Sequence, residues 1–278
     1  MQTDWMESGP TGGSLMTPVV KRLMIINAAI WLAVFLLYVF LPAGAFLGFE
    51  RVLFEWFGVA PHAWNWWLPR VWQVVTYGFL HDYGSPMHLL FNMLGLYFFG
   101  SMLEGIVGAR RFLGFYLAAI VVGGLVALTW SALSAAPSVT LGASGGVLGV
   151  IVAMARLRPK TRVIFFIFPM TLATLAMIFV GLDLFRLLTA GKSMGGDVSF
   201  QAHLGGAAFG FLAAHRNWLW VDPFERIESL RSERKQQRAV ADEEKLDAIL
   251  AKIHKNGIHS LSASEKAFLK RAGQRKSG

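Results

Sequence analysis

The chain has 278 residues, of which 55% are hydrophobic and only 15% are charged. A water-soluble domain carries about 25% charged residues, and the apolar residues here come in long runs, so the composition indicates a protein that crosses a membrane several times. The absence of cysteine excludes disulfides and thiol chemistry. Positive segments beside membrane spans explain the net charge of +9, which argues against nucleic acid as a partner.

Six apolar segments are candidates to span the hydrocarbon core of a bilayer. They lie near residues 21–41, 86–103, 111–133, 143–157, 161–182 and 200–220. The second, fourth and sixth are shorter or rich in glycine, so we expect protein rather than lipid around them. The predicted fold class is an all-α membrane protein with a six-transmembrane-helix bundle over 21–220, preceded by a flexible segment over 1–20.

The connection between the first two spans, about 42–85, is unusually long. It is rich in tryptophan and phenylalanine and carries few charges. Aromatic side chains of this kind concentrate at the membrane–water interface. We expect a partly helical loop embedded in that interface; the alternative is a loop that lies on the protein surface.

Lysine and arginine residues predict the orientation of the spans, because cytoplasmic loops carry an excess of them. They gather before the first span, in the second-to-third and fourth-to-fifth connections, and in the C-terminal tail. We therefore expect a multi-pass protein of the bacterial inner membrane with both termini in the cytoplasm. Ser144 then lies near the outer face, where the fourth span begins.

Residues 221–278 form a polar tail with a composition of their own. A charged stretch over 223–246 predicts a solvated helix, and a helix–turn–helix unit follows at about 243–273. Asn256-Gly257 is expected to end the first helix of this unit, and Ser262 with Glu265 forms a capping box for the second. The tail contains no catalytic constellation, which favours a cytoplasmic docking or stability module.

One serine has the setting of a nucleophile. Gly142-Ala143-Ser144-Gly145-Gly146 fits the G-x-S-x-G pattern. By itself the pattern is weak, because a membrane helix rather than a soluble sheet surrounds it. The alternative is a helix-packing motif of small residues, in which Gly145 and Gly149 allow a neighbouring helix to approach.

Three polar side chains lie at the same predicted depth as Ser144. His88 and Asn92 are four residues apart, so they project from one face of the second span, and His203 begins the sixth. A polar side chain inside a membrane must find a partner or line a wet cavity. Each alone is compatible with a helix–helix hydrogen bond, but their common level with Ser144 indicates a site.

A hydroxyl becomes a nucleophile when a base accepts its proton. His203, His88 or histidines of the outer loops are the candidates. Gly145 and Gly149 facing Gly206 and Gly210 would let two helices approach closely enough for this contact.

The start of the fourth span also offers free backbone N–H groups to a developing oxyanion, with Asn92 and His88 as further donors. No metal is expected, since there is no HExxH and the histidines are not at ligand spacing.

The stretches FLH, HLLFN, GASG and AHLGG, in this order across about 70–220, resemble the rhomboid family of intramembrane serine proteases. The resemblance implies a serine–histidine dyad without an aspartate, with Ser144 as nucleophile and His203 as base. It also implies an oxyanion hole of Asn92, His88 and the Ser144 backbone N–H, with Gly142 in the first position of the motif.

The same resemblance matches His81 to a loop histidine near the site, and the long loop to a membrane-embedded one. Trp72-Gln73 stands where many members have Trp-Arg, a departure that concerns the anchoring of this loop. Asp82, Asp183 and Asp197 have no spacing that ties them to His203, so we interpret them as solvated loop charges.

The expected function is that of a serine endopeptidase that needs no cofactor. Its partners would be the bilayer and membrane-protein substrates with a locally unstable transmembrane helix. The alternative is a non-proteolytic rhomboid-like protein that binds or dislocates membrane proteins. Such relatives usually lack the serine or the base, and this chain keeps both.

Overall fold

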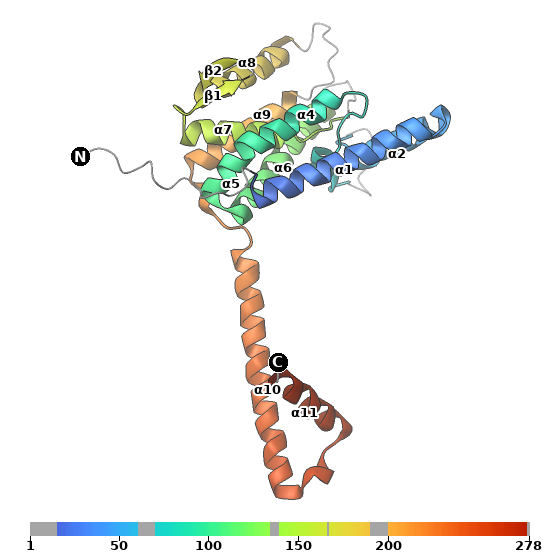
Figure 1. Ribbon diagram of the computed structural model, residues 1–278, viewed down its shortest axis with the longest axis vertical. Coiled ribbons are helices and arrows are strands. Elements are labelled where there is room, and N and C mark those ends of the chain that lie inside the picture. The colour runs from blue at the N-terminus through green and yellow to red at the C-terminus, as the bar shows by residue number, and fades with distance from the viewer. Residues whose placement is uncertain (1–15, 61–69, 134–138, 166, 190–199, 277–278) are drawn as a thin grey trace, which may run out of the picture. The chain divides into compact units, whose positions relative to one another are not determined.

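The computed structural model describes residues 16–60, 70–133, 139–165, 167–189 and 200–276 (Figure 1). The chain divides into two compact units, Met1–Asp222 and Pro223–Gly278. The first unit contains α1 (Pro18–Phe40), α2 (Ala43–Phe57), α3 (Gln73–Thr76), η2 (Tyr77–Phe79), α4 (Pro86–Gly95), η3 (Leu96–Gly100), α5 (Ser101–Val107), α6 (Ala109–Leu133), α7 (Ser144–Leu157), β1 (Arg162–Phe165), β2 (Phe168–Thr171), α8 (Leu172–Thr189), α9 (Phe200–His215) and η4 (Trp218–Trp220).

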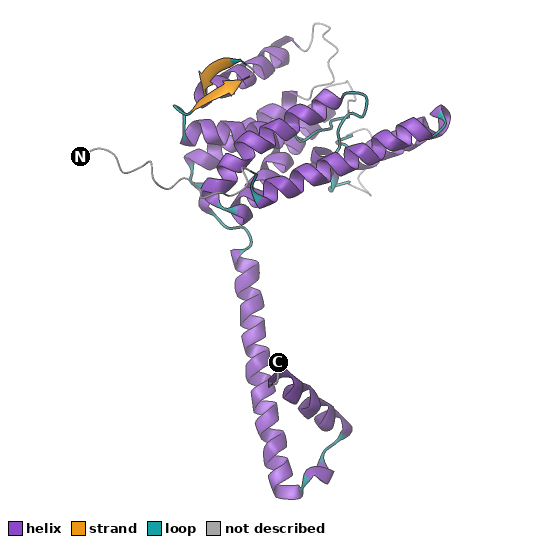
Figure 2. Ribbon diagram, viewed as in Figure 1, coloured by secondary structure: helices purple, strands orange, loops and turns teal. Residues whose placement is uncertain are grey.

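Helices dominate this unit, as predicted, and the protein is an integral membrane protein with several spans (Figure 2). Among the described residues, four segments are long and apolar enough to cross a membrane: Pro18–Phe40, Pro86–Val107, Ala109–Leu133 and Leu172–Thr189. The second of these runs continuously through α4, the π-helical stretch η3 and α5. The helices over the predicted fourth and sixth spans, α7 and α9, are shorter.

The prediction of a helix over 161–182 was wrong in its N-terminal half. There β1 and β2 pair antiparallel, and α8 begins only at Leu172. The two strands are rich in β-branched and aromatic side chains, which favour extended backbone. Pro169, in β2, has no N–H to donate and would break a helix at this point.

The helix α7 is the buried centre of the first unit. Every residue from Gly145 to Ala155 is buried, and α7 packs most extensively on α9. With 14 residues, α7 rises only about 21 Å, whereas the hydrocarbon core is about 30 Å thick.

The first turn of α1 is capped by a side chain from another helix. Pro18 has a preset φ and no N–H to leave unpaired. The buried Glu104 carboxylate on α5 accepts hydrogen bonds from the N–H groups of Val19 at 3.0 Å and Val20 at 2.9 Å, and from the Thr17 hydroxyl. A negative group at this end satisfies free donors and matches the helix dipole. It also joins the start of α1 to α5.

The long connection after α1 is partly helical, as predicted, since α2 and α3 lie within it. Its expected position in the membrane interface stays a prediction. Residues 61–69, which include Trp64, Trp66 and Trp67, lie outside the described residues.

The C-terminal end of α2 is anchored by side chains near the start of α3. Arg70 and the buried Gln73 both donate to the Glu55 carbonyl at 2.6 Å, and the Trp72 indole donates to the Trp56 carbonyl at 2.7 Å. The Arg70 guanidinium also lies over the Trp56 ring, 4.3 Å from its centroid. The loop is therefore anchored without an arginine at position 73, because Arg70 supplies the cation and Gln73 supplies an amide donor.

The second unit consists of α10 (Glu225–Asn256), η5 (Ile258–Ser260) and α11 (Ala263–Lys276). The predicted charged helix and the first helix of the helix–turn–helix unit are one continuous helix, α10. It ends as expected at Gly257, whose φ is +76°. The capping box is confirmed: Glu265 N–H donates to Ser262 Oγ at 3.2 Å, and Ser262 N–H donates to Glu265 Oε2 at 2.7 Å.

The capping carboxylate makes the start of α11 sensitive to acid. Hydrogen bonds from Lys252 and from Ser262 lower the pKa of Glu265 to about 2. A lowered pKa contributes stability that is present above the ordinary value of 4.5 and is lost as pH falls toward about 2. We expect hydrogen-exchange protection of α11 amides, corrected for intrinsic rates, to decrease over this range in the full-length protein. Glu265→Gln should already show the low protection at neutral pH, whereas the exposed Glu233→Gln should not; equal protection in both variants would contradict the prediction.

Candidate active site

Ser144 is the first residue of α7 and follows a tight turn. Gly142, two residues earlier, has a φ of +115°, which side chains other than glycine rarely adopt. Its N–H donates to the Tyr77 carbonyl at 2.9 Å, so the turn is tied to η2. This turn brings the serine hydroxyl to the beginning of a buried helix.

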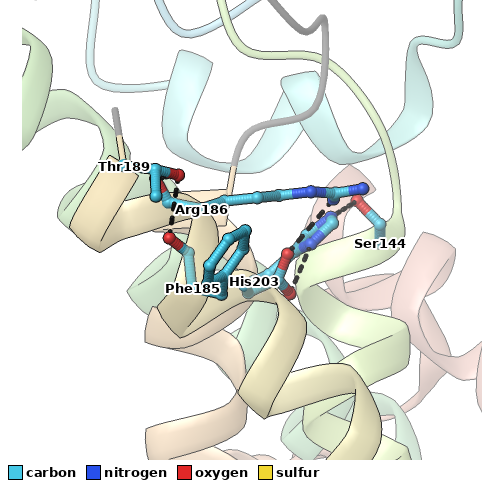
Figure 3. Close-up of polar contacts among 6 residues, drawn as sticks. Ser144, Phe185, Arg186, Thr189 and His203 are labelled. Carbon is cyan, nitrogen blue, oxygen red and sulfur yellow. Dashed lines mark hydrogen bonds and ion pairs between the residues drawn. The ribbon is translucent and has the colours of Figure 1, made fainter. Parts of the chain in front are cut away.

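His203 lies in the first turn of α9, 59 residues after Ser144, and the two side chains meet (Figure 3). The distance from His203 Nε2 to Ser144 Oγ is 2.6 Å. The His203 side chain is only 13% exposed. The structure thus brings together the hydroxyl and one of the candidate bases that the sequence indicated.

Glycines permit this contact, as predicted. A Cβ on Gly206 would lie 1.9 Å from the Gly145 carbonyl oxygen, and one on Gly210 would lie 2.2 Å from that of Gly149. Real Cβ atoms do not come so close to backbone, so no side chain fits at either position of α9. The starts of α7 and α9 are consequently near enough for a serine and a histidine side chain to touch.

The interpretation of Asp183 as a solvated loop charge was wrong. Asp183 lies within α8 and is buried, with 4% of the residue exposed. Its Oδ2 lies 2.9 Å from His203 Nδ1, and its Oδ1 lies 3.4 Å from Arg186 Nη1. The sequence contained one signal for this contact, a carboxylate inside an apolar segment, where it requires a partner. Asp197 lies outside the described residues.

His88 also reaches the site, from α4. A Cβ on Gly142 would lie 2.7 Å from His88 Nε2 and 3.6 Å from Ser144 Oγ, so the imidazole and the hydroxyl flank the same glycine. The rings of His81 and His88 have centroids 5.1 Å apart, and His81 is buried. The glycine at position 142 therefore leaves room for a histidine beside the serine.

Asn92 lies one turn further along α4 and is buried. Its Nδ2 donates to the His88 carbonyl at 2.9 Å, a bond within the same helix. The side chain therefore lies on the His88 side of α4, as the four-residue spacing predicts. Among the described residues, no three His, Asp or Glu side chains are grouped so that they could hold a metal ion.

Comparison with known proteins identifies the domain that carries these residues. A model of the Rhomboid domain matches residues 68–218, and a model of a family of unknown function, DUF6576, matches residues 231–275. The first match contains Ser144 and His203; the second falls within the C-terminal unit.

Three similar proteins also carry rhomboid names. RHOMBOID-like protein 12, mitochondrial, from Arabidopsis thaliana is 34% identical over 52% of this chain and 46% of its own length. Rhomboid protein 1, mitochondrial, from Saccharomyces cerevisiae is 32% identical over 45% of this chain and 36% of its own length. Rhomboid protease GluP from Bacillus subtilis is 30% identical over 51% of this chain and 25% of its own length.

The chain thus aligns with less than half the length of each of these relatives. The rhomboid model, however, covers more than half of this chain and coincides with the helices that bring Ser144 and His203 together. The chain therefore belongs to the rhomboid family.

Proposed function

We propose that this protein is an intramembrane serine endopeptidase that cleaves transmembrane segments of other membrane proteins. The observation that carries the proposal is the 2.6 Å separation of Ser144 Oγ and His203 Nε2 at the start of α7. A hydroxyl at hydrogen-bond distance from an imidazole is the arrangement that activates serine as a nucleophile. A protein that only binds or dislocates membrane clients would not need this contact.

In the proposed reaction, Ser144 Oγ attacks the scissile carbonyl carbon while His203 Nε2 accepts the hydroxyl proton. His203 then donates that proton to the leaving amine as the C–N bond breaks, which leaves an acyl-enzyme on Ser144. Water, with His203 again as base, hydrolyses the ester and restores the serine. The Ser144 backbone N–H, at the start of α7, is proposed to donate to the oxyanion together with His88 and Asn92.

The proposed substrates are transmembrane helices that unwind easily. A peptide carbonyl inside a helix is hydrogen-bonded and shielded by the helix, so the enzyme needs an extended stretch. Glycine and other poor helix formers lower the cost of unwinding. A cleavage site rich in small residues is therefore part of the proposal.

The proposed topology follows the basic residues. Both termini and the tail lie on the side of the basic loops, and Ser144 lies toward the opposite face of the membrane. The short α7 supports this proposal: its rise of about 21 Å from the exposed arginines at its C-terminal end is less than the thickness of the hydrocarbon core, so Ser144 would lie below that face and cleavage would take place beneath the membrane surface.

A fluorophosphonate probe tests the nucleophile directly. Protein in nanodiscs is expected to form one covalent adduct, located at Ser144 by mass spectrometry. Ser144→Ala should not be labelled, and His203→Ala should be labelled far more slowly because the base is missing. Ser131→Ala, which removes another buried hydroxyl from a membrane helix, serves as the matched control and should react like the wild type. An adduct on the Ser144→Ala protein would refute the assignment.

A further inference from the structure

We propose that Asp183 is a positioning residue that holds the His203 ring in the orientation and tautomer required for catalysis; the inference rests on the proposed function. The site would then operate with three side chains from three helices: Ser144 from α7, Asp183 from α8 and His203 from α9. The two contacts that define this series are Ser144 Oγ to His203 Nε2 at 2.6 Å and His203 Nδ1 to Asp183 Oδ2 at 2.9 Å.

The burial of Asp183 calls for an explanation. The buried residues of α8 are Leu172, Leu175, Ala176 and Asp183, so Asp183 is the one polar member of this set and lies apart from the others along the helix. A carboxylate inside a membrane protein is costly unless it is paired. Its paired groups here are His203 and Arg186, so the cost of burial is offset at the site itself.

The chemistry of the three groups determines where the imidazole proton lies. An ionised carboxylate only accepts hydrogen bonds, so the contact with Asp183 requires a proton on His203 Nδ1. In the neutral ring this leaves a lone pair on Nε2, facing Ser144 Oγ. The hydroxyl must then donate to Nε2, which is the direction of proton transfer that nucleophilic attack needs. If Nε2 carried the ring proton instead, it would have no lone pair facing Ser144 and could not accept the proton of the serine hydroxyl.

Arg186 is suited to pair with Asp183 and to orient its carboxylate. It lies three residues after Asp183 in the same helix, and its Nη1 lies 3.4 Å from Oδ1, leaving Oδ2 for the imidazole. The arginine side chain extends from α8 toward the side of the site where Ser144 and His203 lie (Figure 3). The guanidinium is half-exposed.

A purely structural role for Asp183 makes different predictions. If the carboxylate only joined α8 to α9, its loss would lower thermal stability and would alter substrate binding. In the molecules that remain folded, the His203 proton would stay on the same ring nitrogen and the rate of the chemical step would not change. Stability, KM, kcat and the tautomer of His203 therefore separate the two roles.

The experiment compares full-length wild type, Asp183→Asn and Asp222→Asn in nanodiscs. Asp222→Asn is the matched control, because it makes the same change in an aspartate that pairs with Arg110. The readouts are the rate of fluorophosphonate labelling, kcat and KM for a fluorescent single-span model substrate with a Gly–Ala cleavage site, thermal unfolding, and 15N NMR of histidine-labelled protein.

For Asp183→Asn we expect labelling and kcat to fall together by about 10⁴-fold, the scale on which an orienting carboxylate acts in serine proteases. We expect KM and the unfolding temperature to stay near the wild-type values. The NMR spectrum of wild type should show the His203 proton on Nδ1, and Asp183→Asn should move it to Nε2, because the asparagine amide can donate to Nδ1.

Unchanged kcat and labelling in Asp183→Asn, or a loss confined to stability and KM, would overturn the inference. A wild-type His203 that carries its proton on Nε2 would overturn it as well, and this measurement needs neither activity nor a folded variant. Failure of the proposed function has a separate signature: wild type itself would show no labelling or cleavage that depends on Ser144.

Discussion

Replacing His203 with alanine is expected to slow hydrolysis of a membrane-embedded substrate by about 10⁴-fold or more. The imidazole lies 2.6 Å from Ser144 Oγ and is the proposed acceptor of its proton. Ser144→Ala should lose a similar factor. The double variant should lose no more than either single variant, because the hydroxyl and the imidazole act in one step. Initial rates with a fluorescent single-span model substrate in proteoliposomes measure all three.

The matched control for this prediction is His215→Ala. His215 is an exposed histidine at the other end of α9, where its Nδ1 lies 3.4 Å from an Arg156 nitrogen. Its replacement should leave cleavage near the wild-type rate. The prediction would be contradicted if the free-energy losses of Ser144→Ala and His203→Ala summed in the double variant. Additive losses would mean that the two residues act independently.

Gly206→Ala is expected to disrupt both the packing of α9 on α7 and the site. The new Cβ would lie 1.9 Å from the Gly145 carbonyl oxygen, and backbone cannot move aside as a flexible side chain can. Overpacking typically costs about 1–3 kcal/mol, occasionally more, and a backbone clash places this substitution at the upper end. Separation of the helices would also lengthen the contact between Ser144 and His203. We therefore expect both the rate of fluorophosphonate labelling and the unfolding temperature to decrease in this variant.

Gly105→Ala provides the control for a glycine-to-alanine change in a helix of the same unit. A Cβ at position 105 has no heavy atom within 4 Å, so the substitution should be neutral or should stabilise α5 by about 0.5–1 kcal/mol. Thermal unfolding in nanodiscs and the labelling rate at Ser144 are the measurements. Wild-type stability and labelling in Gly206→Ala would show that the glycine contact is not what brings the two helices together.

Much of the site was predictable from the sequence, because the residue types and spacings that indicate it lie within single helical segments. Gly145 and Gly149 in α7, and Gly206 and Gly210 in α9, stand four residues apart and so lie on one face of each helix. Ser144 and His203 begin these two helices, and close packing of the glycine faces brings them together. The catalytic roles of Ser144 and His203, and those of His88 and Asn92, stay predictions that the experiments above test.

The errors arose where the outcome depends on nonlocal contacts. The sequence 161–182 is predominantly apolar, and apolarity suits both a membrane helix and a strand pair, so the hairpin ahead of α8 was not expected. The anchoring of the loop by Arg70 likewise depends on where the Glu55 carbonyl lies after folding.

By itself the sequence predicted the helical membrane fold, because long apolar runs follow from residue type along each segment. The motifs in their order resembled the rhomboid family, and that resemblance implied the pairing of Ser144 with His203. Only the tertiary structure decided that Asp183 belongs beside His203. The two residues are 20 positions apart on different helices, and the rotation of α8 about its axis relative to α9 is set by packing between helices, which no spacing along the chain encodes.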